Sequence, residues 1–307
     1  MSNLSSPRVL HNTIRLLLGV FFIGTAVLKL LSIDNFELYI YSFGIFSYTW
    51  TTFLSRLLIF IELIIGISLI FKICFKKTWW LTLLMMAGFT LFLVYAAIFR
   101  DDSNCHCFGS LVELNPIQSI FKNIIVIALL IVIKNEQSHD YKPALRKWLV
   151  ALTLVVSFVI SFVLLPMDVV YNRIYSDNED VNEAAFHESL NDSAFVELQE
   201  GRYLINYALA GCKYCKIGAE KATMMFDRHG ISHERLKFFV GGSDEAVERF
   251  IEVTGTEDYE HWKIAAHRFM SITYGKFPLF VFIEDGRVVK AGDFRIVDDE
   301  VIASFFE

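Results

Sequence analysis

The stretch Arg202-Tyr-Leu-Ile-Asn-Tyr-Ala-Leu-Ala-Gly-Cys-Lys-Tyr-Cys215 joins an apolar run to a pair of cysteines. Residues 202–209 have the composition of a buried strand, and the residues from Cys212 to about Arg228 have the spacing of a helix that ends at Gly230. The cysteines therefore fall on the first helical turn, where free backbone N–H groups and the helix dipole stabilise a thiolate. We expect Cys212 to have a lowered pKa and act as nucleophile, with Cys215 as the resolving thiol.

The residues that follow predict a domain of mixed strands and helices. An Asp285-Gly286 pair between two apolar runs is a strong hairpin signal, and Ser243 can cap a helix after Gly241-Gly242. The expected elements are a strand over Glu234–Val240, a helix over Glu257–Met270, hairpin strands over Phe277–Ile283 and Arg287–Lys290, and a helix over Asp298–Phe306.

Over residues 194–307 the chain resembles the thioredoxin superfamily. The resemblance is carried by the strand, Cys212-x-x-Cys215, the helix, and Phe277-Pro278 before the hairpin. It implies a cis peptide bond at Pro278 and binding of extended polypeptide at Phe277, Pro278, Lys213 and Tyr214. Two positions depart from the family pattern, because Gly211 replaces the usual aromatic residue and Asn206 replaces a buried acid. The resemblance therefore does not extend to the group that removes the proton from Cys215.

Composition divides the chain into two parts. Its residues are 54% hydrophobic and its mean hydropathy is +0.46, which is too apolar for an ordinary soluble protein. Up to Leu165 there are 13 Lys and Arg against 8 Asp and Glu, whereas the remainder has 15 against 26, a net charge of −11. The acidic remainder would repel phosphate, so we expect no nucleic-acid partner.

Five runs approach the length of about 20 apolar residues that crosses a bilayer. The first is followed by Asp34-Asn35-Phe36-Glu37 without a small-residue cleavage site, so we expect it to be retained rather than removed as a signal peptide. The predicted transmembrane helices are 14–33, 53–71, 79–99, 117–133 and 148–165. Membrane lipid is therefore an expected partner.

The basic residues of the connecting segments fall on one side of these helices. The opposite loops, 33–52 and 100–116, hold Arg100 as their one clear loop cation. Because Lys and Arg stay on the cytoplasmic side, we expect a cytoplasmic N-terminus and a periplasmic C-terminal domain in a bacterial inner membrane. The residues on the basic side are Arg8, Arg15, Lys72, Lys76, Lys77, Lys134, Lys142, Arg146 and Lys147.

A second cysteine pair, Cys105-His106-Cys107, lies in the predicted outer loop between the third and fourth helices. Such a spacing can close as a small, strained disulfide, and strained disulfides tend to be oxidising and labile. Ionisable residues inside membrane helices usually face a site or the interior of the bundle. We therefore expect Glu62, Lys29, Arg56 and Lys122 to surround this loop, and the first three to hold a membrane quinone as electron acceptor. For Lys29, Arg56 and Lys122, the alternative is that each side chain extends to the membrane interface.

Residues 9–135 resemble the MauE/DoxX-like membrane family. The resemblance is carried by Phe21-Phe-Ile-Gly24 through Lys29-Leu30, by Glu62-x-x-x-Gly66, and above all by Cys105-x-Cys107-Phe108-Gly109. It implies a four-helix membrane domain involved in disulfide formation beside a thioredoxin-like protein, as in methylamine dehydrogenase maturation. The expected organisation is a four-helix domain over 1–138, a fifth connecting transmembrane helix over 139–166, an acidic linker over 167–193, and a periplasmic α/β thioredoxin-like domain over 194–307.

These features predict a membrane-bound thiol-disulfide oxidoreductase. Cys212 and Cys215 would exchange disulfides with cysteine-containing periplasmic proteins, and Cys105 and Cys107 would reoxidise them and pass electrons to quinone. A lone Cys74 at the cytoplasmic end predicts a buried small hydrophobic residue rather than a cytoplasmic electron entry point.

Other functions fit the same cysteines. A CxxC is also half of a zinc site, with His229 or His233 as further ligands, and Cys105-His106-Cys107 could bind copper or zinc. A reversed electron flow would make the chain a reductase for haem or metal-site maturation. A metal chaperone that uses all four cysteines, or a scaffold with incidental cysteines, are the non-enzymatic alternatives.

Overall fold

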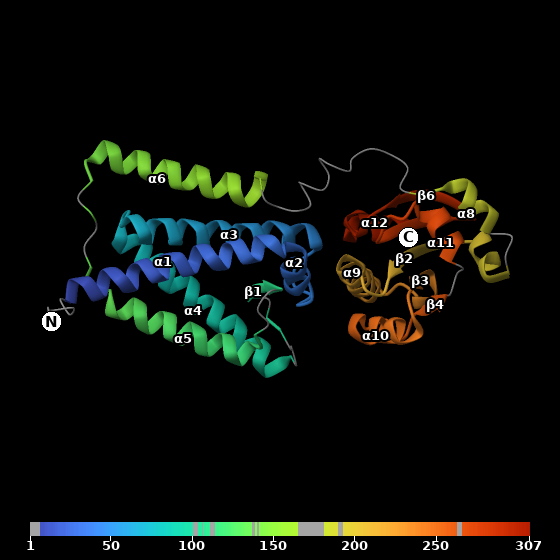
Figure 1. The fold of residues 1–307 in the computed structure, drawn as a ribbon, viewed down its shortest axis with the longest axis horizontal. Coiled ribbons are helices and arrows are strands. Elements are labelled where there is room, and N and C mark those ends of the chain that lie inside the picture. Colours follow the sequence, from blue (N-terminus) through green and yellow to red (C-terminus); the bar gives the residue numbers. More distant parts are fainter. Residues whose placement is uncertain are drawn as a thin grey trace. The chain divides into compact units, whose positions relative to one another are not determined.

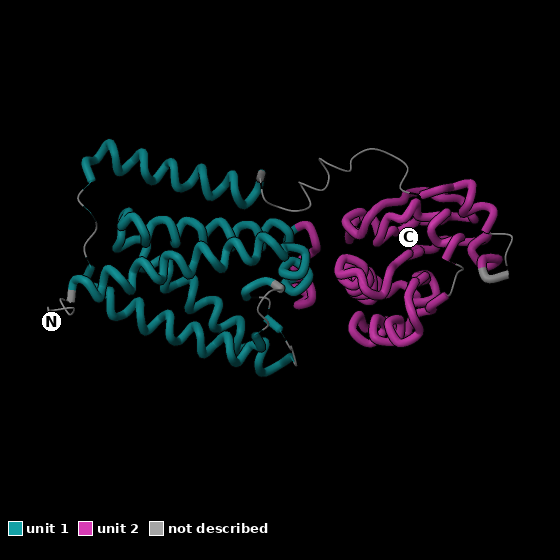
Figure 2. The backbone as a smooth tube through the Cα atoms, viewed as in Figure 1, with its two compact units in different colours: residues 1–40, 50–174 teal, residues 41–49, 175–307 magenta. Residues whose placement is uncertain are grey.

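The computed structural model describes residues 7–100, 104–105, 107–110, 114–136, 139, 141–164, 181–189, 193–262 and 266–307. The chain forms two compact units, one of residues 1–40 and 50–174 and the other of residues 41–49 and 175–307 (Figure 2). His106, Pro166 and the acidic run Asp177–Asp180 lie outside the described residues.

The first unit is built from long apolar helices (Figure 1). Four helices in the described part are long and apolar enough to cross a membrane, while α5 is apolar but has 17 residues. All five predicted membrane runs are therefore helical, and the chain is a membrane protein. The elements are α1 (Pro7–Leu31), α2 (Ile33–Tyr41), α3 (Tyr48–Phe71), α4 (Phe75–Phe99), β1 (Cys107–Ser110), α5 (Pro116–Val132), α6 (Pro143–Phe158) and a π-helical turn, Val159–Leu164.

Two glycines bring α1 and α3 close together. A Cβ atom added at Gly19 would lie 3.0 Å from the carbonyl oxygen of Gly66, and one added at Gly66 would lie 2.9 Å from that of Gly19. Small residues at a crossing point let membrane helices pack backbone to backbone. Beside this crossing, the core of the helices contains Leu18, Phe22, Leu69, Met86 and Leu130.

The π-helical turn that follows α6 contacts α3. The Phe162 ring lies 6.1 Å from Phe53 and 6.4 Å from Phe60, both on α3. The buried face of α6 carries the small polar residues Thr153 and Ser157, which continue to Ser161 in the π-helical turn. Small hydroxyl residues at such spacing favour close contact between membrane helices.

The second unit contains a five-stranded mixed sheet in the order β4-β3-β2-β5-β6. Strand β2 (Arg202–Leu209) is parallel to β3 (Leu236–Gly241) and antiparallel to β5 (Leu279–Glu284), which continues into β6 (Arg287–Gly292). This arrangement confirms an α/β domain. The remaining elements are β4 (Glu260–Trp262), α8 (Glu183–Ser189), α9 (Lys213–His229), α10 (Asp244–Thr254), α11 (Ala266–Thr273), α12 (Asp299–Phe306) and short 3-10 turns at Ser193–Gln199, His233–Arg235 and Phe294–Ile296.

The helix predicted over 257–270 is wrong in its first half. Residues 260–262 form β4, which pairs with β3 through Lys237 and Glu260. Lys237 is 2% exposed, and its ammonium forms ion pairs with Glu260 and, at 2.7 Å, with Glu197. A buried ammonium needs such partners. The strand conformation of residues 260–262 places Glu260 beside Lys237, so pairing with β3 overrides the local helical pattern.

The predicted acidic linker over 167–193 is also partly folded. Helix α8 lies within it, and Phe186 on that helix is fully buried with Phe195, Tyr207 and Phe239. Burial of a phenylalanine side chain stabilises a domain by about 1.5–3 kcal/mol. The folded part of the C-terminal unit therefore begins before residue 194.

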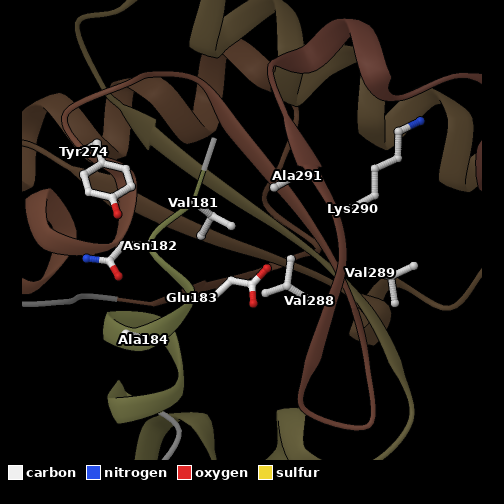
Figure 3. A pocket seen from close by; sticks show the side chains of 9 residues that line it. All are labelled: Val181, Asn182, Glu183, Ala184, Tyr274, Val288, Val289, Lys290 and Ala291. Carbon is white, nitrogen blue, oxygen red and sulfur yellow. The ribbon is translucent and has the colours of Figure 1, made fainter. Parts of the chain in front are cut away.

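A hollow of about 530 Å³ lies between the start of α8 and the edge strand β6. Figure 3 shows the Glu183 side chain directed toward Val288, while the Lys290 side chain extends away from it. None of the cysteines lines this hollow, so it does not belong to the thiol chemistry. Its lining residues are Val181, Asn182, Glu183, Ala184, Tyr274, Val288, Val289, Lys290 and Ala291.

Candidate redox sites

Cys212 is the N-cap residue of α9. Its sulfur accepts a hydrogen bond of 3.2 Å from the backbone amide of Cys215, and its own amide donates to the Leu209 carbonyl at 2.9 Å. A hydrogen bond from the Cys215 thiol, followed by backbone N–H groups of Cys215 and Tyr214, lowers the pKa of Cys212 to about 6. This confirms the expected direction, although the neighbouring thiol contributes more than the helix terminus that predicted it.

Cys215 has the opposite environment. Its side chain is fully buried, and the backbone amide of Leu209 donates to its sulfur at 3.4 Å. The hydrogen bond to Cys212 and burial raise the pKa of the Cys215 thiol. The accessible Cys212 therefore carries the thiolate while Cys215 keeps its proton, which is the division expected of a nucleophile and a resolving thiol.

The predicted cis peptide bond at Phe277-Pro278 is present. Leu279 pairs with Tyr207 across β5 and β2, so the step before it lies at the end of β2 that leads toward Cys212. Phe277 stacks on Phe269 with ring centroids 5.0 Å apart.

The two residues between the cysteines are accessible. Lys213 is exposed, and Tyr214 is 38% exposed while its ring stacks on Phe294 at 6.1 Å. Both can therefore contact a polypeptide that approaches Cys212.

The two departures from the thioredoxin pattern differ in their surroundings. Asn206 on β2 is fully buried, and neither polar atom of its amide has a hydrogen-bond partner in the part of the chain that the structure describes. Gly211 is exposed, and a Cβ atom there would meet nothing within 4 Å. Packing at this position would therefore accept a larger residue.

In the membrane unit, Cys105 and Cys107 form a disulfide bond. The two residues are 0% and 2% exposed, and the Cys105 amide donates to the Leu114 carbonyl at 2.8 Å. The Cys105 sulfur lies 2.9 Å from the hydroxyl oxygen of Ser119 on α5. The pair is thus enclosed by protein, with one hydroxyl group in contact with a sulfur atom.

Strand β1 holds this disulfide against α1. Gly109 has a φ of 68°, and a Cβ atom there would lie 2.5 Å from the carbonyl oxygen of Leu28 and even closer to the Ser32 hydroxyl. Such a conformation and such a contact both require glycine. The preceding residue, Phe108, packs its ring against Phe21 with centroids 5.9 Å apart.

A polar cluster lies inside the same helices. The ammonium of Lys29 forms a buried ion pair with Glu62, and the Thr25 hydroxyl lies 3.5 Å from the same carboxylate. Lys122 interacts electrostatically with both charged groups, and its ammonium lies 4.7 Å from the centre of the Phe108 ring. Because Phe108 directly follows Cys107, this cluster adjoins the disulfide.

Of the predicted group Glu62, Lys29 and Arg56, the structure brings Glu62 and Lys29 together and places Arg56 elsewhere. Arg56 precedes Glu62 by six residues on α3, or about 9 Å along the helix axis. Its guanidinium lies 3.9 Å from Glu37, which also accepts a hydrogen bond of 3.1 Å from Ser55. Arg56 therefore takes part in a second polar cluster, centred on Glu37.

Ser119 is the functional candidate that the sequence did not reveal. It is separated from Cys105 by 14 residues, and Pro116 and the Asn115 capping box start α5 at the point that directs Ser119 toward the sulfur. The available signal was a hydroxyl residue in the first turn of an apolar helix directly after the cysteine loop.

Comparison with known proteins finds a family match for helices α1 to α5. Residues 7–134 match the family model of methylamine utilisation protein MauE. The match confirms the MauE-type domain that the sequence resemblance implied, and it includes Lys29, Glu62 and the cysteine loop. Protein TlpB of Flavobacterium psychrophilum is 26% identical over 303 residues, which cover 80% of this chain and 80% of TlpB. No solved structure matches the chain.

Proposed function

We propose that the chain is a membrane-bound thiol-disulfide oxidoreductase in which an α/β domain exchanges disulfides with client proteins and the MauE-type domain reoxidises it. The observation that carries the proposal is the difference between the two thiols of α9, since Cys212 is accessible with a pKa of about 6 and its partner Cys215 is buried. This is the arrangement that a thiol-exchange nucleophile requires.

The arrangement around Cys212 supports a thioredoxin-like domain. A central β2 leads into the CxxC helix, a parallel β3 follows, and β5 begins after a cis proline. We propose that Phe277, Pro278, Lys213 and Tyr214 contact the client polypeptide, since the sheet register and the chain itself bring them toward Cys212.

The proposed exchange of electrons and protons takes place in two steps. In the first, a client dithiol reduces the Cys212–Cys215 disulfide through a mixed disulfide on Cys212, which yields an oxidised client and a Cys212/Cys215 dithiol. In the second, this dithiol reduces the Cys105–Cys107 disulfide in the same way. Two electrons and two protons thereby pass from the client to Cys105 and Cys107, and an acceptor must remove them.

A membrane quinone would supply that acceptor, taking up two electrons and two protons when bound. The residues beside the disulfide fit such a group, because Lys29 and Lys122 offer N–H donors for carbonyl oxygens and Glu62 offers a proton carrier. Aromatic rings complete the surroundings, with the Lys29 ammonium 5.5 Å from the centre of Phe36 and 5.9 Å from that of Phe89. We therefore assign quinone binding to Lys29, Glu62 and Lys122, and leave Arg56 out.

The proposed location is the bacterial inner membrane, with the cysteine-containing domain in the periplasm. Its support is the distribution of charge, since the connections between α3 and α4 and between α5 and α6 carry most loop cations while β1 lies in the connection between α4 and α5. The clients are then periplasmic proteins that contain cysteine pairs.

Trapping tests this function. In a Cys215→Ser variant, a mixed disulfide on Cys212 cannot be resolved, so we expect covalent adducts on non-reducing gels that disappear with dithiothreitol. The matched control is the Cys212→Ser/Cys215→Ser double variant, which should form none. Stable expression of the single variant without adducts, in cells that contain disulfide-bonded periplasmic proteins for the Cys212 thiolate to attack, would refute the assignment.

A further inference from the structure

A cleft of about 500 Å³ opens in the membrane unit between α3, α4 and α6. It lies at the end of these helices opposite the contacts that Phe162 makes with α3. A neighbouring hollow of about 760 Å³ shares Cys74, Lys77, Leu81 and Arg146 with it, so the two form one continuous groove. We call these two hollows together the α4/α6 groove.

The rim of the α4/α6 groove is cationic. Lys77, Arg146 and Lys147 line the cleft, and Lys76 lines the neighbouring hollow. All four side chains are exposed, and none forms an ion pair with a residue that the structure describes. No acidic residue within the described ranges lines either hollow. Among the described residues, these four positive charges at the rim therefore have no counter-charge.

Three other cations at this end of the unit have partners within the protein. Lys72 forms an ion pair with Glu136 at 2.5 Å, and Arg15 lies 3.7 Å from the same carboxylate. The Lys134 ammonium lies 5.8 Å from the centre of the Trp79 ring. These three cations therefore have partners within the protein, whereas the four at the rim of the α4/α6 groove form no ion pair with a described residue.

The walls below this rim are apolar and open toward the surroundings of the helices. Ile64, Val150 and Leu154 line the cleft, and Trp80 and Leu84 line the neighbouring hollow. Leu84 is 66% exposed and Trp80 50% exposed. In a membrane helix such side chains contact acyl chains, so the groove combines a cationic rim with walls suited to hydrocarbon.

We propose that the α4/α6 groove binds an anionic phospholipid, with its phosphodiester head group at the cationic rim and an acyl chain along the apolar walls. Basic pockets between membrane helices recognise acidic lipid head groups in this way. A zwitterionic lipid would carry its own positive charge to the rim, and a free phosphate would make no use of the apolar walls. The ligand class is therefore a lipid with net negative charge.

Lipid titration of the purified full-length protein in detergent tests this proposal, with bound lipid counted by native mass spectrometry. The probes are dioleoyl phosphatidylglycerol and dioleoyl phosphatidylcholine, which share their acyl chains and differ in net charge. We expect phosphatidylglycerol to bind at least tenfold more tightly, and 10 mM inorganic phosphate, on the order of a physiological concentration, to leave its binding unchanged.

Paired variants separate this site from general surface charge. Lys77→Gln/Arg146→Gln should weaken phosphatidylglycerol binding roughly 30-fold, because each basic residue near an acidic lipid contributes about a factor of five. Arg8→Gln/Lys142→Gln removes two exposed cations of the same end that do not line the groove, and should leave binding unchanged. Leu81→Trp, which keeps every charge and fills the groove, should also weaken binding.

Equal binding of the two lipids would overturn the proposal, as would equal losses in the two double variants. Displacement of the lipid by inorganic phosphate would overturn the lipid assignment in favour of a phosphate site. None of these outcomes depends on the thiol chemistry, because bound lipid is measured without turnover.

Discussion

The backbone amide of Cys215 lies 3.2 Å from the sulfur of Cys212 and donates a hydrogen bond to it. The same residue therefore supplies a donor that stabilises the Cys212 thiolate and, in the proposed exchange, the thiol that attacks the mixed disulfide. The hydrogen bond to Cys212 and burial raise the pKa of the Cys215 thiol, so this thiol stays protonated beside the Cys212 thiolate. Nucleophile and resolving thiol are thus distinguished by position on a single helical turn.

The reactivity of Cys212 should follow its pKa. In the reduced protein, the rate at which iodoacetamide alkylates Cys212 should rise with pH and reach half its maximum at about pH 6. Peptide mass spectrometry of the labelled position measures this rate, and Lys213→Gln serves as a control that should keep the midpoint. A midpoint near the ordinary thiol value of about 8.5 would contradict the assigned environment.

The same shift predicts how stability depends on pH. The pKa of Cys212 is lower in the folded state than in the unfolded chain, so the thiolate stabilises the reduced domain. This contribution is fully present above the unfolded pKa and is lost as pH falls through about 6.

Ser119→Ala should slow the exchange of Cys105–Cys107. The substitution removes the hydroxyl group that lies 2.9 Å from the Cys105 sulfur. One hydrogen bond contributes about 0.5–1.5 kcal/mol, so the reoxidation rate of the Cys212/Cys215 dithiol should fall up to roughly tenfold. Stopped-flow thiol labelling measures that rate, and Ser55→Ala, which removes a buried hydroxyl group beside Glu37, is the matched control. Equal rates in the two variants would deny Ser119 a role at the disulfide.

Gly109→Ala should displace β1 from α1. The new methyl group would overlap the Leu28 carbonyl and the Ser32 hydroxyl, at a backbone φ that disfavours alanine. Overpacking of this kind costs about 1–3 kcal/mol, which should lower the melting temperature in detergent. Gly24→Ala places a methyl group where nothing lies within 4 Å and should not lower it. If Gly109→Ala and Gly24→Ala have the same melting temperature, β1 does not pack against α1 as described.

Variants of the Lys29–Glu62 ion pair should distinguish its contribution to stability from its contribution to electron transfer. Glu62→Leu leaves a buried ammonium without its partner and should cost about 3–5 kcal/mol of unfolding free energy. Lys29→Met/Glu62→Leu replaces both charges and should restore most of that stability, while reoxidation of Cys105/Cys107 by quinone stays lost. A double variant that is stable and fully active would remove this pair from the proposed quinone site.

Local sequence patterns predicted the elements whose structure is determined by residues adjacent in the chain. The helix opened by Cys212, the hairpin at Asp285-Gly286 and the apolar membrane runs each follow from adjacent residues, and the structure has them. The cis peptide bond at Pro278 came instead from the family resemblance, and the structure has it as well.

The differences arise where distant residues decide the outcome. Residues 260–262 become a strand because β3 lies beside them, and Phe186 orders part of an acidic segment because Tyr207 and Phe239 offer it a core. Arg56 was grouped with Lys29 by membrane depth alone, whereas the middle of α2 brings Glu37 to it. The contact between Ser119 and Cys105 likewise depends on how the loop returns to α5, which residue spacing does not encode.

The central claim is that Cys105 and Cys107 reoxidise Cys212 and Cys215. The most direct test is the in-cell redox state of the Cys212/Cys215 pair, measured by acid quenching and alkylation in the natural chain and in Cys105→Ala. The account predicts a mainly oxidised pair in the natural chain and a mainly reduced pair in the variant. A pair that is mainly reduced in both would contradict it.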